Sequence, residues 1–96
     1  MVGGVGRRDP KHLAWVREQN CCVPSCMEGL VQAHHVRLAS TSGIGHKPPD
    51  WWVVPLCVRH HVEIHSHGAK TFEAAHAVNL AELANWYALT SGQEMP

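Results

Sequence analysis

The segment WWVVPLCVRHHVEIHSH, residues 51–67, changes its hydrophobic pattern halfway along its length. Up to Leu56 it is apolar and rich in aromatic and β-branched side chains, which predicts a strand. From Cys57 onward the pattern becomes helical, and His61 and His65 fall four residues apart on one face. The segment therefore predicts a strand followed directly by a helix that carries a pair of histidines.

A second strand is predicted upstream, over residues 30–36, and it ends at the adjacent pair His34 and His35. Serine, threonine, glycine and proline dominate residues 39–49, which predicts a loop between the two strands. The strands are expected to pair as a hairpin with this long connection. Pro55 has no amide hydrogen, so it is expected to prevent ladder pairing near the end of the second strand.

Helices are expected on both sides of this unit. Asp9 followed by Pro10 is typical of a helix start, which predicts a helix over about 10–19. Downstream, Gly68 is expected to end the histidine-bearing helix, and Thr71 is expected to cap another one. A last amphipathic helix is predicted from a capping pair and an apolar face: Asn79 and Glu82 at its start, then Leu80, Leu83, Ala84 and Tyr87.

The chain has 96 residues, which predicts one α+β domain at 9–90, with a mobile N-terminus at 1–8 and a tail at 91–96. A domain of this size buries roughly 60–65% of the surface that its unfolded chain exposes, so its core alone is marginal. A metal ion or a disulfide is therefore expected to brace it. No stretch is typical of a signal peptide or a membrane span, which favours a cytoplasmic location.

The charges and the histidines give different indications about nucleic acid. Eight Lys and Arg balance eight Asp and Glu, and a strong non-specific nucleic-acid binder would normally be basic. Histidine is unusually frequent, however: nine are present, most of them between His34 and His67. Histidine is the commonest metal ligand and a general base near neutral pH, so the cluster predicts metal chemistry.

The cysteines form part of a second predicted metal site, because cysteines in a reducing compartment more often bind metal than form disulfides. Two short ligand pairs are present: Cys21 or Cys22 with Cys26, and Cys57 with His60. Two pairs from distant segments can complete a tetrahedron, which predicts a structural zinc that ties the cysteine-rich turn to the helix. A disulfide between Cys26 and Cys57, or plain buried thiols, are the alternatives.

Three histidines predict a catalytic metal site. His61 and His65 can both reach one cation, and His34 supplies a third imidazole from the strand end. Three protein ligands leave positions open for water and a phosphate oxygen. Adjacent strand residues point to opposite faces, so we assign His34 to the ion and His35 to the activation of water. The expected ion is Mg²⁺ or Mn²⁺, although imidazoles also suit Zn²⁺ or Ni²⁺. The alternative is that these are ordinary histidines, as we expect for the surface residues His12, His46, His67 and His76.

The strings AHHVR at 33–37 and GHKPPDWWVVPLCVRHHVEIHSHG at 45–68 resemble HNH endonucleases, and more closely the phage RecA-dependent nuclease-like (Ref-like) group. The shared features are an AHH segment, a G-x-K-x-x-D loop and a PLC-x-x-HH-x-x-x-H helix. The resemblance covers about residues 12–78. It implies a ββα-metal fold, in which a hairpin and a helix hold one divalent ion.

The resemblance also implies roles for individual residues. It makes His34 a metal ligand and His35 the general base, with His61 and His65 as the ligands on the helix. In zinc-containing members a second set of residues holds a structural zinc, and the matching positions here are Cys21, Cys26, Cys57 and His60, the last in place of the usual cysteine.

One position departs from the pattern of the resembling family. The middle HNH residue is commonly an asparagine that orients the base, and Trp52 stands at that position here. Asp50 is expected to orient His35 in its place by accepting a hydrogen bond. Lys47 and Arg59 are the candidates for phosphate contacts.

The function predicted from these features is metal-dependent hydrolysis of DNA phosphodiester bonds, by nicking or by double-strand cleavage. DNA is the expected partner, and the resemblance adds a recombinase filament as a second one. The resemblance to a phage group also implies that the cytoplasm is that of a bacterium or a phage-infected host. A rival function is a zinc-stabilised nucleic-acid-binding module without catalysis, in which His34, His35 and His61 would be dispensable for binding. A third is an interaction subunit with Trp51 and Trp52 as an exposed apolar patch, although we expect both in the strand core and groove wall.

Overall fold

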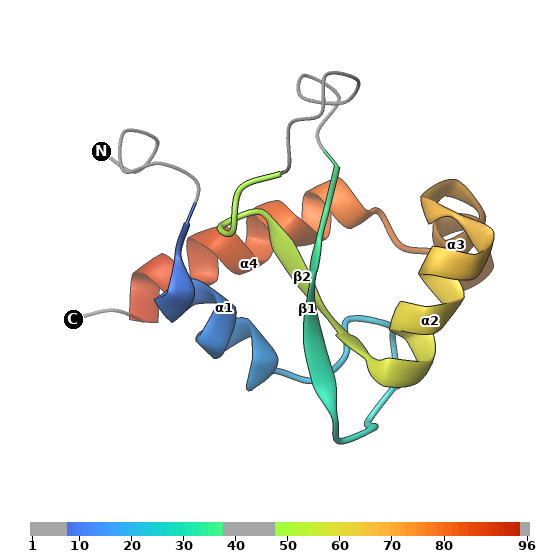
Figure 1. Cartoon of the computed structure of the whole chain (residues 1–96), viewed down its shortest axis with the longest axis horizontal. Helices are drawn as coiled ribbons and strands as arrows, with labels where there is room; N and C mark the ends of the chain where they lie inside the picture. The colour runs from blue at the N-terminus through green and yellow to red at the C-terminus, as the bar shows by residue number, and fades with distance from the viewer. Residues whose placement is uncertain (1–7, 38–47, 95–96) are drawn as a thin grey trace.

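The computed structural model describes residues 8–37 and 48–94, and within them a two-stranded sheet lies among helices (Figure 1). In chain order the elements are α1 (Pro10–Arg17), β1 (Val31–His35), β2 (Val53–Cys57), α2 (Val58–His67), α3 (Ala69–His76) and α4 (Leu80–Glu94). The predicted α+β class is confirmed, and the predicted hairpin is followed directly by its helix. Helix α4 continues past residue 90, where the domain was expected to end.

The hairpin accommodates a proline inside its ladder. Pro55 lies opposite Ala33, so the expectation that it prevents pairing there is wrong. Two flanking hydrogen bonds fix the pattern, from the Val36 amide to the Trp52 carbonyl and from the Val58 amide to the Leu30 carbonyl, at 3.0 and 3.2 Å. Bonded and non-bonded positions alternate in an antiparallel pair, and this pattern puts Pro55 at a non-bonded one. Its missing amide hydrogen therefore removes nothing from the ladder.

Strand β2 begins later than predicted because its first residues form a turn. The amide of Trp52 donates to the carbonyl of Pro49 at 3.0 Å, and the strand starts only at Val53. Trp51 and Trp52 are both partly buried, and Trp52 packs against the core. They therefore do not form the exposed apolar patch that one rival function required.

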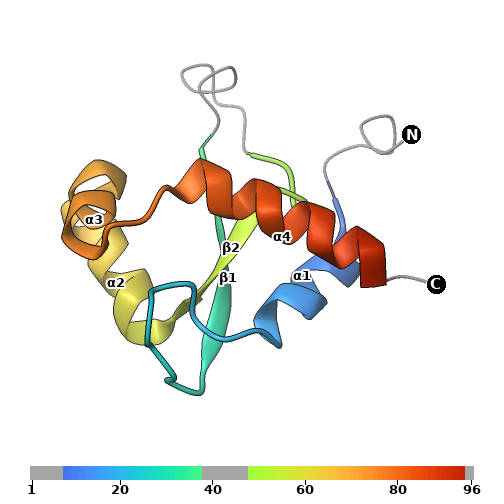
Figure 2. The ribbon, with the colours of Figure 1, turned by 180° about the vertical axis from the view of Figure 1, so that it is seen from behind.

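Strand β2 is the centre of the molecule, and all five of its residues are buried. Figure 2 shows α4 crossing the hairpin on one side, where it contacts β2. Helix α4 also contacts α1, which itself contacts both strands. The largest fully buried side chains include Phe72 of α3 and Leu56 of β2. Leu80 and Ala84, on the predicted apolar face of α4, join the same core, and Leu83 and Tyr87 pack against it.

The first helix begins as predicted and buries a histidine that was expected at the surface. The side chain of Asp9 accepts a hydrogen bond from the amide of His12 at 3.1 Å, which caps α1. His12 is only 5% exposed, and its ring stacks on Trp15. The expectation that His12 lies at the surface is therefore wrong, and its burial lowers the pKa of the imidazole.

The junctions after α2 confirm two predicted caps and correct a third. Gly68 ends α2 and also precedes α3, which starts at Ala69, so Thr71 lies inside that helix and does not cap it. Asn79 accepts a hydrogen bond from the amide of Glu82 at 2.9 Å, as the capping pair predicted. Within the described part of the chain, no helix is both long and apolar enough to cross a membrane.

Candidate metal centres

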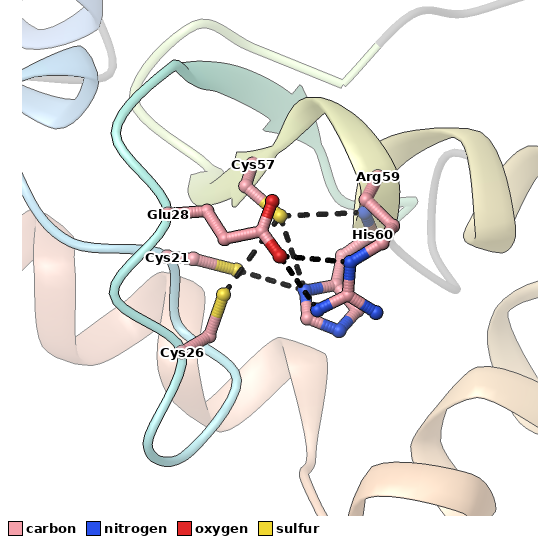
Figure 3. A network of polar contacts seen from close by, with 6 residues as sticks. All are labelled: Cys21, Cys26, Glu28, Cys57, Arg59 and His60. Carbon is pink, nitrogen blue, oxygen red and sulfur yellow. Dashed lines mark hydrogen bonds and ion pairs between the residues drawn. The ribbon is translucent and has the colours of Figure 1, made fainter.

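Three cysteines and one histidine meet in a closed, buried cluster (Figure 3). Its members are Cys21, Cys26, Cys57 and His60, and their candidate ligand atoms all lie within 4.8 Å of one another. The Nδ1 atom of His60 is 3.4 Å from the sulfur of Cys21 and 3.2 Å from that of Cys57. A tetrahedral zinc with bonds of about 2.3 Å to sulfur would set two sulfurs about 3.8 Å apart. The sulfurs of Cys26 and Cys57 are 3.8 Å apart, so the cluster can hold a metal ion such as zinc.

The same distance decides against the disulfide alternative. A disulfide brings its two sulfurs to about 2.05 Å, far closer than those of Cys26 and Cys57. All four cysteines are free thiols in this structure. Cys22 is partly buried against the core and lies outside the cluster. Of the two adjacent cysteines, it is therefore Cys21 that belongs to the metal-binding set. Burial raises the pKa of Cys22 to about 12, as befits a thiol that remains protonated.

Local backbone geometry brings the two halves of this cluster together. The turn that carries Cys21 and Cys26 is closed by a hydrogen bond from the Cys26 amide to the Val23 carbonyl, at 3.0 Å. It docks on the hairpin through the amide of Cys22, which donates to the Pro55 carbonyl at 2.8 Å. Cys57 is the last residue of β2 and the N-cap of α2, where its sulfur accepts from the His60 amide.

A second cluster, open to solvent on one side, joins β1 to α2. The candidate ligand atoms of His34, His61 and His65 lie within 4.8 Å of one another. His34 and His61 are partly buried, whereas His65 is exposed. Burial lowers the pKa of His34 to about 4, helped by the nearby His61 and His65. The imidazole of His34 is therefore neutral at pH 7, which is the form that binds a cation.

Gln32 is a contact of this open cluster that the sequence interpretation missed. Its Oε1 atom is 2.6 Å from Nδ1 of His61, close enough to accept a hydrogen bond from that nitrogen. A signal for it existed, because Gln32 and His34 are two residues apart on β1 and so share a face of the strand. A carbonyl oxygen in this position is the usual outer partner of a metal-binding histidine.

On the other side of β1, His35 meets the carboxylate of Asp50. The Nε2 atom of His35 is 2.8 Å from Oδ1 of Asp50, and the second oxygen accepts from the Asp9 amide at 3.0 Å. Burial acts to raise the pKa of Asp50, but the hydrogen bonds from His35 and Asp9 outweigh it and leave the pKa below its ordinary value. Asp50 is thus ionised at pH 7, and the structure brings together the pair that the sequence predicted.

His34 and His35 point to opposite faces of the strand, yet both line one groove of about 610 Å³ at the end of β1. The opposite wall of the groove comes from α3 and the start of α4, and His65 of α2 lies on its margin. A single molecule in this groove can therefore contact the open cluster and His35 at the same time.

The two predicted phosphate contacts have different outcomes. Arg59 lies beside the cysteine cluster, where its guanidinium pairs with Glu28 at 2.8 Å (Figure 3). It does not line the groove at the end of β1. Lys47, like His46, lies outside the described residues.

His76, expected at the surface, is partly buried and completes an outer layer around His60. Its Nε2 atom pairs with Glu63 at 2.8 Å, and its ring centroid is 5.0 Å from that of His60. His60, Glu63 and His76 also bring candidate ligand atoms within 4.8 Å of one another. Since the Nδ1 of His60 faces the cysteine sulfurs, we interpret the pair behind it as support for that imidazole.

The structure thus defines a small α+β domain with a closed cysteine–histidine cluster and an open histidine cluster. Residues 7–92 match the family described as "Protein of unknown function (DUF968)", and the chain belongs to that family. It is also similar to "Uncharacterized protein YdfU" of Escherichia coli (strain K12), with 36% identity over 56 residues. That match covers 58% of this chain and 16% of the relative, so the chain corresponds to a small part of the longer protein. No solved structure matches the chain.

Proposed function

We propose that this protein is a metal-dependent endonuclease that hydrolyses the phosphodiester bonds of DNA. The observation that carries the proposal is the groove at the end of β1, which is lined by His34 and His65 of the open cluster and by His35, the partner of Asp50. A hairpin followed directly by a histidine-bearing helix is also the arrangement that an HNH, or ββα-metal, core requires. A cation held by three imidazoles keeps positions open for a phosphate oxygen and water.

The proposed chemistry begins with which ring nitrogen of His35 carries the hydrogen. The ionised Asp50 accepts the hydrogen on Nε2 of His35, which leaves the lone pair of Nδ1 free to take a proton from water. The oxygen of that water then forms a bond to phosphorus, and the bond from phosphorus to the 3′ oxygen breaks. The leaving oxygen acquires a proton from solvent, so the products are a 5′ phosphate and a 3′ hydroxyl.

His34, His61 and His65 would hold the divalent ion of the reaction. When bound, that ion supplies the positive charge that stabilises the transition state and the leaving oxygen. Mg²⁺ and Mn²⁺ are the proposed ions, and the imidazole ligands also suit Zn²⁺ or Ni²⁺. One such site cuts one strand per event, so double-strand cleavage would take two events. A recombinase filament remains a second proposed partner.

The closed cluster has a different proposed role. Zinc held by Cys21, Cys26, Cys57 and His60 would be structural, because all four ligands come from the protein and all are buried. None of the four residues lines the groove at the end of β1, so the zinc would take no direct part in the proposed reaction.

The test is cleavage of supercoiled plasmid by purified, zinc-loaded protein with each of the four ions. We expect metal-dependent nicking that falls by roughly 10²–10⁴-fold in His35→Ala, which is the usual contribution of a general base. His67→Ala is the matched control, since His67 is an exposed histidine of the same helix α2 and belongs to neither metal cluster. It should cleave as the wild type does.

Two results would contradict the proposal. Equal nicking by the wild type and His35→Ala would indicate a contaminating nuclease. Tight DNA binding without cleavage by any ion would instead support the non-catalytic binding module as the function.

A further inference from the structure

The groove at the end of β1 carries two cations that the proposed chemistry does not use. Arg37 lies two residues after the end of β1, and Lys70 lies in the first turn of α3. Both line the groove together with His34 and His65, although they are 33 positions apart in the sequence (70 minus 37). The fold has thus placed two positive side chains from separate elements beside the open histidine cluster.

These two charges are not neutralised by neighbours in the described part of the chain. Across residues 8–37 and 48–94, neither Arg37 nor Lys70 takes part in an ion pair, and both side chains are exposed. Arg59 is different, because Glu28 pairs with it at 2.8 Å beside the closed cluster. A chain with zero net charge therefore still places two positive side chains, neither of them ion-paired within the described residues, beside one groove.

A carboxylate also lines the groove, and its position matters. Glu73 lies one turn after Lys70 on α3, and its Oε2 atom accepts a hydrogen bond from the amide of Leu80 at 2.8 Å. That bond directs the carboxylate toward the first amide of α4, where the helix dipole offsets negative charge. The carboxylate therefore opposes an anion in the groove less than a free glutamate would.

We propose that Arg37 and Lys70 bind a backbone phosphate next to the scissile one on the substrate strand. This inference rests on the proposed nuclease function. A guanidinium matches two phosphate oxygens with a fixed pair of N–H groups, and an ammonium adds a point charge. The lining of the groove also includes the apolar residues Ile64 and Leu80, which suit the sugar of the strand. Contacts of this kind position the strand and read no bases.

Binding is measured apart from cleavage, in protein that carries His35→Ala and its zinc, with Mn²⁺ and a fluorescent DNA duplex. We expect Arg37→Gln and Lys70→Gln each to weaken binding about tenfold. The slope of log Kd against log salt should fall by roughly 0.9 for each lost contact. Lys11→Gln is the matched control, an exposed lysine of α1 outside the groove, and it should change neither value.

Two further measurements separate phosphate binding from a structural effect. Lys70→Arg keeps the charge and should restore most of the affinity, and calorimetry should give the same Mn²⁺ affinity for every variant. In otherwise wild-type protein, the two Gln variants should raise KM for plasmid more than they lower kcat.

The outcomes distinguish this inference from the function on which it rests. If the wild type cleaves DNA and neither Gln variant changes Kd or the salt slope, the phosphate site is wrong and the nuclease proposal stands. If the wild type neither binds nor cleaves DNA with any ion, both are wrong. Weakened binding together with lost Mn²⁺ affinity also overturns the inference, because the variants would then act through the metal site.

Discussion

At position 32 a glutamine determines which nitrogen of a neighbouring imidazole is available. Because Oε1 of Gln32 can only accept a hydrogen bond, the hydrogen of His61 must sit on Nδ1, 2.6 Å away. The lone pair of His61 is then on Nε2. A neutral imidazole with its lone pair fixed in this way is prepared for a cation.

We therefore expect Gln32→Met to weaken Mn²⁺ or Ni²⁺ binding by the open cluster about tenfold, the lower end of the usual effect of such partners. Gln32→Glu, which keeps an acceptor at the same reach, should retain the affinity of the wild type. Calorimetry gives the affinities, and the ¹⁵N chemical shifts of the ring report which nitrogen of His61 carries the hydrogen.

A purely structural role of Gln32 would give a different pattern. Gln32 is an exposed residue of β1, so both variants should fold equally well. If the Met and Glu variants bind the ion alike and leave His61 with its hydrogen on Nδ1, the positioning role of Gln32 is disproved.

Individual contacts were predictable from the sequence where a spacing rule reached them or, for His35 and Asp50, where the family resemblance did. The four-residue spacing of His61 and His65 placed both beside His34, because a helix repeats every 3.6 residues. His12 was missed, because a short helix gives no periodicity that distinguishes a buried histidine from an exposed one. The ion pair of Arg59 with Glu28 joins residues 31 positions apart, and no local pattern encodes it.

Among the elements, the junction of α2 and α3 depends on one glycine. Gly68 has φ 90° and ψ 159°, a region of backbone conformation that residues with a side chain almost never adopt. Its amide donates to the Ile64 carbonyl at 2.9 Å, and its carbonyl accepts from the Phe72 amide at 3.0 Å. One residue thus ends a helix and starts the next, and so sets the angle at which Phe72 enters the core.

Gly68→Ala should lower the free energy of unfolding by about 1–3 kcal/mol, which is the cost of holding a side chain in this region. No atom lies within 4 Å of the added Cβ, so the whole loss comes from the backbone. Gly29→Ala is the control, because its Cβ would also meet nothing within 4 Å and its φ is not positive. Urea unfolding of the zinc-loaded proteins gives the difference, and equal stability of the two variants would contradict the expectation.

The elements themselves were predictable where propensity and periodicity agreed. The hairpin, α2 and the capped start of α4 all followed from local signals. Two predictions failed because tertiary pairing decided the outcome. Pro55 fits the ladder because the register places it where no amide is needed, and Thr71 is overridden by the helix start at Ala69. Neither the register nor that start is contained in a local pattern.

At the scale of the whole molecule, the closed cluster joins segments that would otherwise be held by a small core. It connects the turn after α1 with the end of β2 and the first turn of α2. Domains of this size are stable by only about 5–15 kcal/mol, and structural zinc contributes about as much in small peptides. The fold and its metal ion are therefore expected to be lost together.

Removal of zinc by a chelator should abolish the cooperative thermal transition. Cys26→Ala should do the same, because it removes one of the four ligands. Cys22→Ala is the control: that thiol is partly buried near the cluster without belonging to it, so the variant should keep one bound zinc. Differential scanning calorimetry and zinc analysis measure both effects, and a metal-free protein that unfolds as the loaded one does would refute the expectation.

The pH dependence of zinc binding has a definite sign. Burial raises the pKa of Cys21 to about 11 in the folded chain, and the ordinary pKa of an exposed thiol is about 8.5, so without metal this thiol is protonated at pH 7 whether the chain is folded or not. Zinc takes the thiolate, so binding releases the proton, and the affinity must increase as the pH rises. Calorimetry in buffers of different ionisation enthalpy should detect the released proton between pH 6 and 8.

Cys57 belongs to three structures at once, as the end of β2, the cap of α2 and a member of the closed cluster. We therefore expect the closed cluster to fill before the open one during biosynthesis. Zinc that joins Cys57 to the turn that follows α1 would fix the first turn of the helix that presents His61 and His65. For the nuclease proposed above, a newly made chain would act on DNA only after it had taken up zinc, so the zinc supply of the cell would limit that activity.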